Sequence, residues 1–128
     1  MKTFLAVFTG NEETTTNSGW RDLASDEQNA RIEKGLAAWR KWMADNADAL
    51  VFEGGPLGKT KGVSRRGVED ISNMLAGFVV IRAPSHDAAA KKFEGHPHFT
   101  IFPGLGVEVM EMLPVPGRAS ADDDIHQH

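Results

Sequence analysis

The chain has 128 residues, of which 41% are hydrophobic, and this length and composition fit one folded domain with its own core. Fourteen basic and 18 acidic residues give a formal net charge of −4, without the broad basic surface that binding to nucleic acid or an anionic membrane requires. The chain has no cysteine, which excludes disulfides, a thiolate nucleophile and a cysteine zinc site. The apolar run at 3–8 is too short for a signal peptide or a membrane span, so we expect a cytoplasmic protein.

The first predicted elements are a strand and a long helix. Residues 3–9 are apolar on both alternating faces, which is typical of a strand covered on both sides. The polar segment 11–22 predicts a loop, either a flap or a solvated connection. Ser25 and Gln28 have the spacing of a capping box, so a helix is expected to begin there. Gly35 inside that helix indicates close approach of a neighbour or a ligand, and close packing is the commoner reason. The helix should present one apolar stripe, made of Ile32, Leu36, Trp39, Met43, Ala47 and Leu50.

The second half of the chain repeats the alternation of strand and helix. A short strand at 50–53 leads to a charged hairpin arm at 62–71 and then to a central strand at 75–81 that is again apolar on both faces. Ser85 is the expected N-cap of a second helix, and residues 107–113 form the last strand.

Between the second helix and the last strand lies the most informative segment, residues 93–103. Gly95 and Pro97 are expected to end the helix, and a short apolar strand should follow. His96 and His98 therefore lie at a junction between elements, where ring nitrogens that titrate near neutrality suit proton transfer.

The order of elements predicts an α+β fold. The order is strand, helix, strand, arm, strand, helix, strand. It corresponds to a ferredoxin-like split βαβ protomer, with an antiparallel sheet and two helices on one face. The other sheet face is also apolar, so we expect a homodimer that covers it, two sheets face to face. Residues 1–116 form the domain, and 117–128 have too little apolar surface to be more than a flexible tail.

Several segments resemble the YCII-related family over residues 2–116. They are the first strand with Phe4, EGGPL at 53–57, GFVVI at 77–81, SHDAA at 85–89, the His-Pro junction at 96–97 and VEVM at 107–110. The resemblance implies a dimeric α+β barrel of ferredoxin-like protomers and a mostly unassigned function, with a histidine-aspartate pair proposed as catalytic.

Neither member of that pair is retained. His96 stands where the family has its aspartate before a proline, and the counterpart of the family histidine falls near Ala38 or Trp39. The chain therefore resembles a divergent branch with its own pair, His96 and His98. We expect His96 to line a ligand cleft as general acid or base and His98 to support it.

Two other roles for this pair remain open. Histidines two residues apart can share a face of an extended segment and bind a metal, but two imidazoles leave a zinc site short of ligands unless Glu94, Glu108 or a second subunit contributes. Alternatively, the pair caps the helix end and is purely structural.

Other candidate residues lie on the long helix and at the arm. Trp42, on the flank of the helix stripe, is a candidate aromatic wall, whereas Trp39 should pack in the core. Glu53 and Asp70 bracket the arm and could pair with a histidine or form surface salt bridges. The GGPLGKT segment at 54–60 is not a phosphate loop, because three residues rather than four separate its outer glycines. The basic cluster on the arm, which either attracts an anion or is simply solvated, is Lys59, Lys61, Arg65 and Arg66.

Two functions follow. The first is a cofactor-independent enzyme that performs elimination, proton transfer or hydrolysis on a small organic molecule, with His96 and His98 catalytic and with Trp42, Glu53 and Asp70 in the substrate site. The second is a non-catalytic ligand-binding or regulatory module of the same fold. A histidine within hydrogen-bonding reach of a carboxylate in a cleft favours the enzyme. Histidines bonded only to backbone favour the module.

Overall fold

The computed structural model describes residues 1–117, so the predicted tail, apart from Gly117, lies outside the described residues. The main sheet has four antiparallel strands in the order β2-β5-β1-β6. Its strands are β1 (Lys2–Thr9), β2 (Leu50–Pro56), β5 (Leu75–Ala83) and β6 (Gly106–Glu111). A separate hairpin pairs β3 (Thr60–Ser64) with β4 (Gly67–Ile71). The helices are α1 (Glu12–Asn17), α2 (Ser25–Asp45), α3 (His86–Lys91) and α4 (Pro97–Thr100), with 3₁₀ turns at Trp20–Asp22 and Ala47–Ala49.

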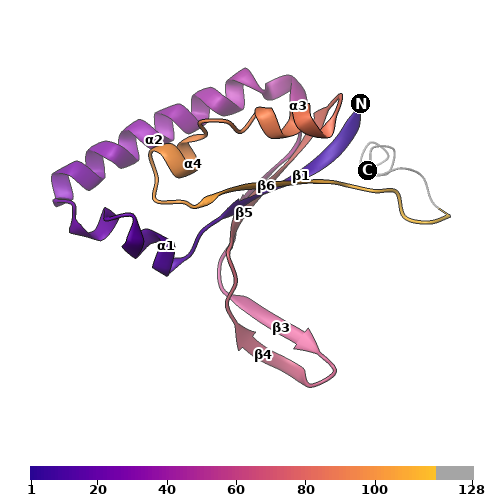
Figure 1. Cartoon of the computed structure of the whole chain (residues 1–128), viewed down its shortest axis with the longest axis horizontal. Coiled ribbons are helices and arrows are strands. Elements are labelled where there is room, and N and C mark those ends of the chain that lie inside the picture. The colour runs from indigo at the N-terminus through magenta and orange to yellow at the C-terminus, as the bar shows by residue number, and fades with distance from the viewer. Residues whose placement is uncertain (118–128) are drawn as a thin grey trace.

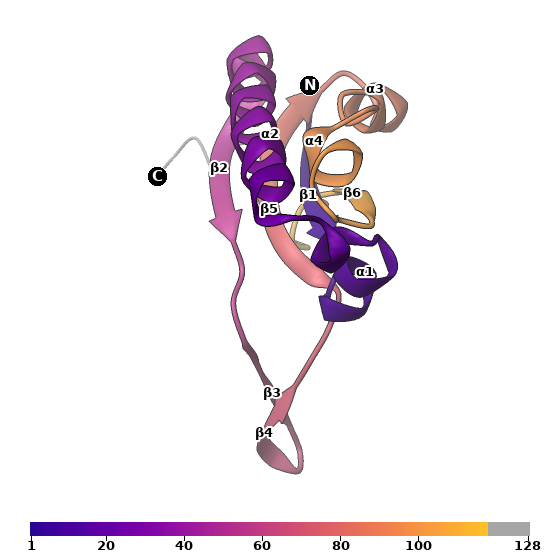
Figure 2. The same ribbon diagram turned by 90° about the vertical axis from the view of Figure 1, so that its left-hand side faces the viewer.

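This strand order confirms the ferredoxin-like protomer. β5 lies between β1 and β2, and β1 lies between β5 and β6, so each half is a split βαβ unit whose helix crosses one intervening strand. The helices α2, α3 and α4 lie on one side of the sheet, and the β3–β4 hairpin projects away from the body as the predicted arm (Figures 1 and 2). No helix within residues 1–117 is long and apolar enough to cross a membrane.

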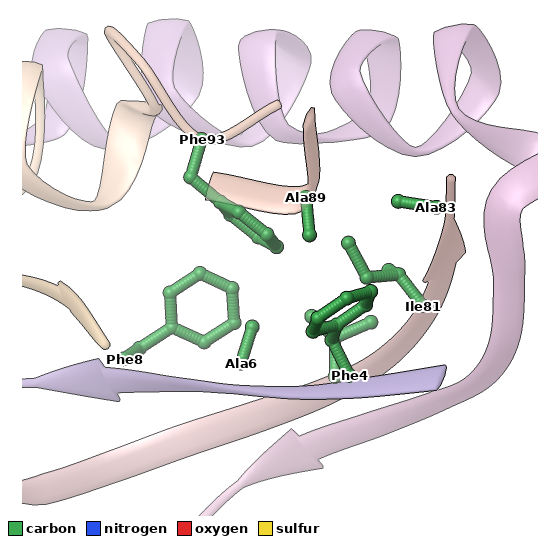
Figure 3. Close-up of a cluster of buried hydrophobic side chains, with 8 residues drawn as sticks. Phe4, Ala6, Phe8, Ile81, Ala83, Ala89 and Phe93 are labelled. Carbon is green, nitrogen blue, oxygen red and sulfur yellow. The ribbon is translucent and has the colours of Figure 1, made fainter. Parts of the chain in front are cut away.

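The alternation of side chains along β1 divides the molecule into a core face and an open face. Phe4, Ala6 and Phe8 point toward the helices, where they meet Phe93 and Ala89 (Figure 3). The buried cluster is completed by the facing residues of β5, which are Val79, Ile81 and Ala83.

The opposite face of the sheet carries an apolar row that spans all four strands. The pairing registers place Phe52, Val80, Leu5 and Met110 side by side. Phe52 is 59% exposed and Met110 is 42% exposed. This is the surface that the apolar pattern of the strands predicts, and no element of residues 1–117 is placed over it in the two ribbon views.

The predicted start and end of the long helix are wrong in detail. Ala24 is the N-cap and makes no side-chain cap bond, while Ser25 is already helical. The Gln28 side chain instead donates to the Trp20 carbonyl at 2.9 Å, because the preceding 3₁₀ turn brings that carbonyl within reach. The helix ends at Asp45, so the last two residues of the predicted stripe belong to the following turn and to β2.

The segment 11–22 is helical rather than a loop. Asn11 has extended backbone and its side-chain oxygen accepts from the Thr14 amide at 2.9 Å, which is N-cap geometry. Glu12 and Glu13 stand in the first turn, where negative charge favours a helix start. Asn11 therefore caps α1 in a sequence without hydrophobic periodicity.

The predicted apolar strand within 93–103 is also a helix. Gly95 adopts a φ of +67°, which turns the chain after α3 as expected. Pro97 then occupies the first position of α4, where its missing amide costs nothing and its fixed φ suits a helix. Pro97 therefore starts a new helical turn instead of introducing a strand.

Candidate ligand-binding cavity

A cavity of about 390 Å³ lies between α2 and the β2–β5 edge of the sheet. Its volume is at the lower end of the ~300–1,000 Å³ range of ligand sites. Five aromatic residues form what we call the aromatic wall, namely Phe8, Trp39, Trp42, Phe78 and Phe102. Two ionisable residues line the same space, Glu53 from β2 and His98 from α4. The cavity is thus mostly apolar, with few polar groups.

His98 is held in the cavity lining by a contact far along the chain. Its Nε2 lies 2.8 Å from the Thr9 carbonyl oxygen, and because a carbonyl only accepts, Nε2 carries the proton. A neutral ring then leaves Nδ1 as an acceptor. Burial lowers the pKa of His98, partly offset by the bond to Thr9, which raises it. His98 is therefore a neutral base at pH 7.

His96 lies behind the aromatic wall. Its side chain is 1% exposed, and its Nδ1 accepts from the His98 amide at 3.0 Å, which makes it the N-cap of α4. The ring packs edge-on against Trp39 at 4.6 Å between centroids and also contacts Trp42 at 5.0 Å. Burial and, to a smaller extent, the neighbouring His98 together lower the pKa of His96 to about 4.

The two histidines thus occupy the reverse of their predicted positions, in which His96 was to line the cleft and His98 to support it. His98 lines the cavity, whereas His96 is absent from the lining and positions His98 and two indoles. Because Nδ1 of His96 accepts, its neutral ring carries the proton on Nε2, and this buried atom has no hydrogen-bond partner within residues 1–117. The surrounding rings shield it from water.

Of the three predicted substrate-site residues, two reach the cavity. Trp42 and Glu53 line it, and the Trp42 indole is locked by a 2.8 Å bond from its Nε1 to the Lys92 carbonyl. Asp70 lies instead on the arm, exposed and ion-paired with Lys61. The arm projects from the sheet, so its carboxylate does not meet the histidines.

Sequence reasoning missed two glycine contacts that shape the cavity. A methyl group at Gly35 would overlap the Phe102 ring, so α2 lacks a side chain where this part of the aromatic wall packs. A methyl at Gly104 would overlap the ring and carbonyl of His98. The sequence marks Gly35 as a close-approach position, but only the fold identifies Phe102 as its neighbour.

No group of three histidine, aspartate or glutamate side chains within residues 1–117 is arranged to hold a metal ion. The hydrogen bonds of the rings of His96 and His98 in this part of the chain are with backbone groups, not carboxylates. By the criterion set from the sequence, this arrangement favours a binding site over a histidine-carboxylate proton relay.

Comparison with known proteins yields a likeness in structure only. The sequence matches no model of a protein family and no curated protein. A similar solved structure is 5-chloro-2-hydroxyhydroquinone dehydrochlorinase from Burkholderia phenoliruptrix in complex with 2,5-dihydroxybenzoquinone. The two chains are 18% identical, the match covers 84% of this chain and 89% of the other, and the TM-score is 0.49. An identity this low transfers neither substrate nor catalytic residues.

Proposed function

We propose that this protein binds a small, largely apolar organic molecule in the cavity between α2 and the sheet. The observation that carries the proposal is the composition of the lining, in which five aromatic residues share the space with a single carboxylate and a single imidazole. The Trp42 indole, held by the Lys92 carbonyl, and a histidine held by the Thr9 carbonyl make the site largely preformed, so binding costs little ordering of side chains.

The test fills the cavity without disturbing the fold. Gly55 lines the cavity, and a Cβ built there meets no atom within 4 Å, so Gly55→Leu places an isobutyl group in the free space. Gly58 has equally open surroundings outside this cavity, which makes Gly58→Leu the matched control. Calorimetric titration with naphthalenemethanol, a neutral two-ring probe, should show binding to the parent and the control. Gly55→Leu should weaken it about 10-fold or more, and unchanged affinity in that variant would refute the site.

Acid-base catalysis in the same cavity is the second candidate. The supporting observation is His98, whose Nδ1 remains an acceptor while Nε2 donates to Thr9, with the Glu53 carboxylate on the same lining. His96 acts here as a positioning residue for His98. If His98 is a general base, the protein should catalyse exchange of the enolisable protons of indanone in D₂O, and His98→Gln should lower that rate by about 10²-fold. No exchange with the parent, together with naphthalenemethanol binding, leaves the binding module as the function.

We further propose a homodimer formed through the apolar row of the open sheet face. Its support is the exposure of Phe52 and Met110 in a row with Leu5 and the buried Val80, because water solvates such apolar side chains poorly. Light scattering should give twice the 13.9 kDa chain mass, and Phe52→Asp should shift it to one chain. A single-chain mass for the parent at micromolar concentration would exclude this assembly. A dimer would agree with a divergent place in the YCII-related family, which the sequence motifs and the ferredoxin-like protomer support.

A further inference from the structure

Among the described residues that line the cavity, Glu53 alone carries a formal charge at pH 7, and that charge is negative. Glu53 is an exposed carboxylate on the lining, and the described residues that line the cavity include no lysine or arginine. The other ionisable group, His98, is buried and offers a neutral ring. A bound anion would therefore lose water without gaining a cationic partner and would meet a like charge.

The aromatic wall also favours a positively charged ligand. Each aromatic ring carries negative electrostatic potential on its face and positive potential at its edge, so a cation over an indole or phenyl face is attracted. Trp39 and Trp42 both line the cavity, and indole is the strongest of these acceptors. A carboxylate beside several aromatic rings is the combination that recognises ammonium groups.

We propose that the ligand of this cavity is an organic cation, an amine or a nitrogen heterocycle with a one- or two-ring apolar body, whose positive end lies at Glu53 and whose rings lie against the aromatic wall. This inference rests on the proposed binding function and names the ligand class. Because Glu53 is exposed, solvent and salt screen its attraction, so the preference is moderate and falls with ionic strength.

Three probes of matched shape separate charge from fit. Naphthylmethylamine, naphthalenemethanol and naphthoate share the ring system and are cationic, neutral and anionic at pH 7. Calorimetry on the full chain at low salt should rank the amine about 10-fold tighter than naphthoate, which corresponds to about 1.4 kcal/mol, with the alcohol between them.

A pair of variants assigns the preference to one carboxylate. Glu53→Gln removes the charge on the lining, and the ratio of amine to naphthoate affinity should fall to about 2-fold or less. Asp70→Asn removes the same charge from the arm, outside this cavity, and should leave the ratio unchanged.

The outcomes distinguish failure of the cation assignment from failure of the proposed binding function. If naphthalenemethanol binds but the three probes bind equally, the cation assignment is wrong while the cavity remains a binding site. If Glu53→Gln retains the preference, the placement of the positive end at Glu53 is wrong. If naphthoate binds most tightly, the assignment is also overturned. If none of the probes binds, the proposed function and this inference both fail.

Discussion

Protonation of His96 should be a major source of acid sensitivity in this fold. The ring is 1% exposed, is surrounded by Phe8, Trp39, Trp42 and Phe93, and has a pKa of about 4 because burial disfavours its charged form. The ordinary value is 6.5. As the pH falls below 6.5, the unfolded chain therefore takes up a proton at this position before the folded chain does.

The sign and size of the effect follow from this difference. A depressed pKa in the folded state means that the contribution of His96 to stability is fully present above pH 6.5 and is lost as the pH falls toward 4. At about 1.36 kcal/mol per pKa unit, the loss between pH 7 and pH 4 amounts to about 3 kcal/mol. This is a large fraction of the ~5–15 kcal/mol that stabilises a typical domain.

His96→Asn isolates the contribution of His96 protonation to the loss of stability in acid. The asparagine oxygen can still accept from the His98 amide as N-cap, but the side chain does not titrate. The free energy of unfolding is measured by urea titration at pH 7 and pH 4, at one fixed protein concentration. The variant is expected to be less stable at pH 7, since a buried ring is removed, and to lose about 3 kcal/mol less than the parent on acidification. Titration of the carboxylates changes the free energy of unfolding of both proteins by the same amount, so it cancels in the comparison. Equal losses in parent and variant would show that His96 is not buried as a neutral ring.

Three further outcomes follow from the packing and the caps. Gly104→Ala should destabilise the fold by about 2 kcal/mol in urea, since its methyl overlaps the cavity histidine, whereas Gly58→Ala, with open space around it, should change stability by less than about 0.5 kcal/mol. Ser85→Ala should cost about 1 kcal/mol by removing the N-cap bond to Ala88, and Ser25→Ala, which loses no cap bond, should be near neutral; equal effects would contradict the cap assignment. Deleting 117–128 should leave the melting temperature unchanged, because that segment has little apolar surface to bury, and a large drop would show that it packs on the domain.

Local patterns in the sequence were sufficient for the order of the four main strands, the long helix α2 and α3, and for the two faces of β1 and β5. The alternation of Phe4, Ala6 and Phe8 with Leu5 and Val7 predicts two apolar faces from side-chain parity alone. These signals depend on neighbours within a few residues, so they survive in an isolated sequence. The ferredoxin-like protomer followed from their order.

Local patterns gave wrong predictions where one short segment is compatible with two local structures. Pro97 can end one helix or begin another, and the turn at Gly95 decided for the second. Ser25 and Gln28 have capping-box spacing, but the carbonyl of Trp20, brought near by a 3₁₀ turn, was the acceptor actually within reach. In both cases the tertiary position of the preceding turn selected the outcome.

The candidate site was decided by the tertiary structure. The chain itself showed that His96 and His98 stand together, that Trp42 lies on the flank of the helix stripe and that Glu53 precedes the arm. Which histidine faces the cavity depends on a bond between His98 and Thr9, 89 residues apart, and on the aromatic rings that enclose His96. Side-chain burial and long-range hydrogen bonds arise only when distant segments meet, because no local pattern encodes which rings will surround a given imidazole.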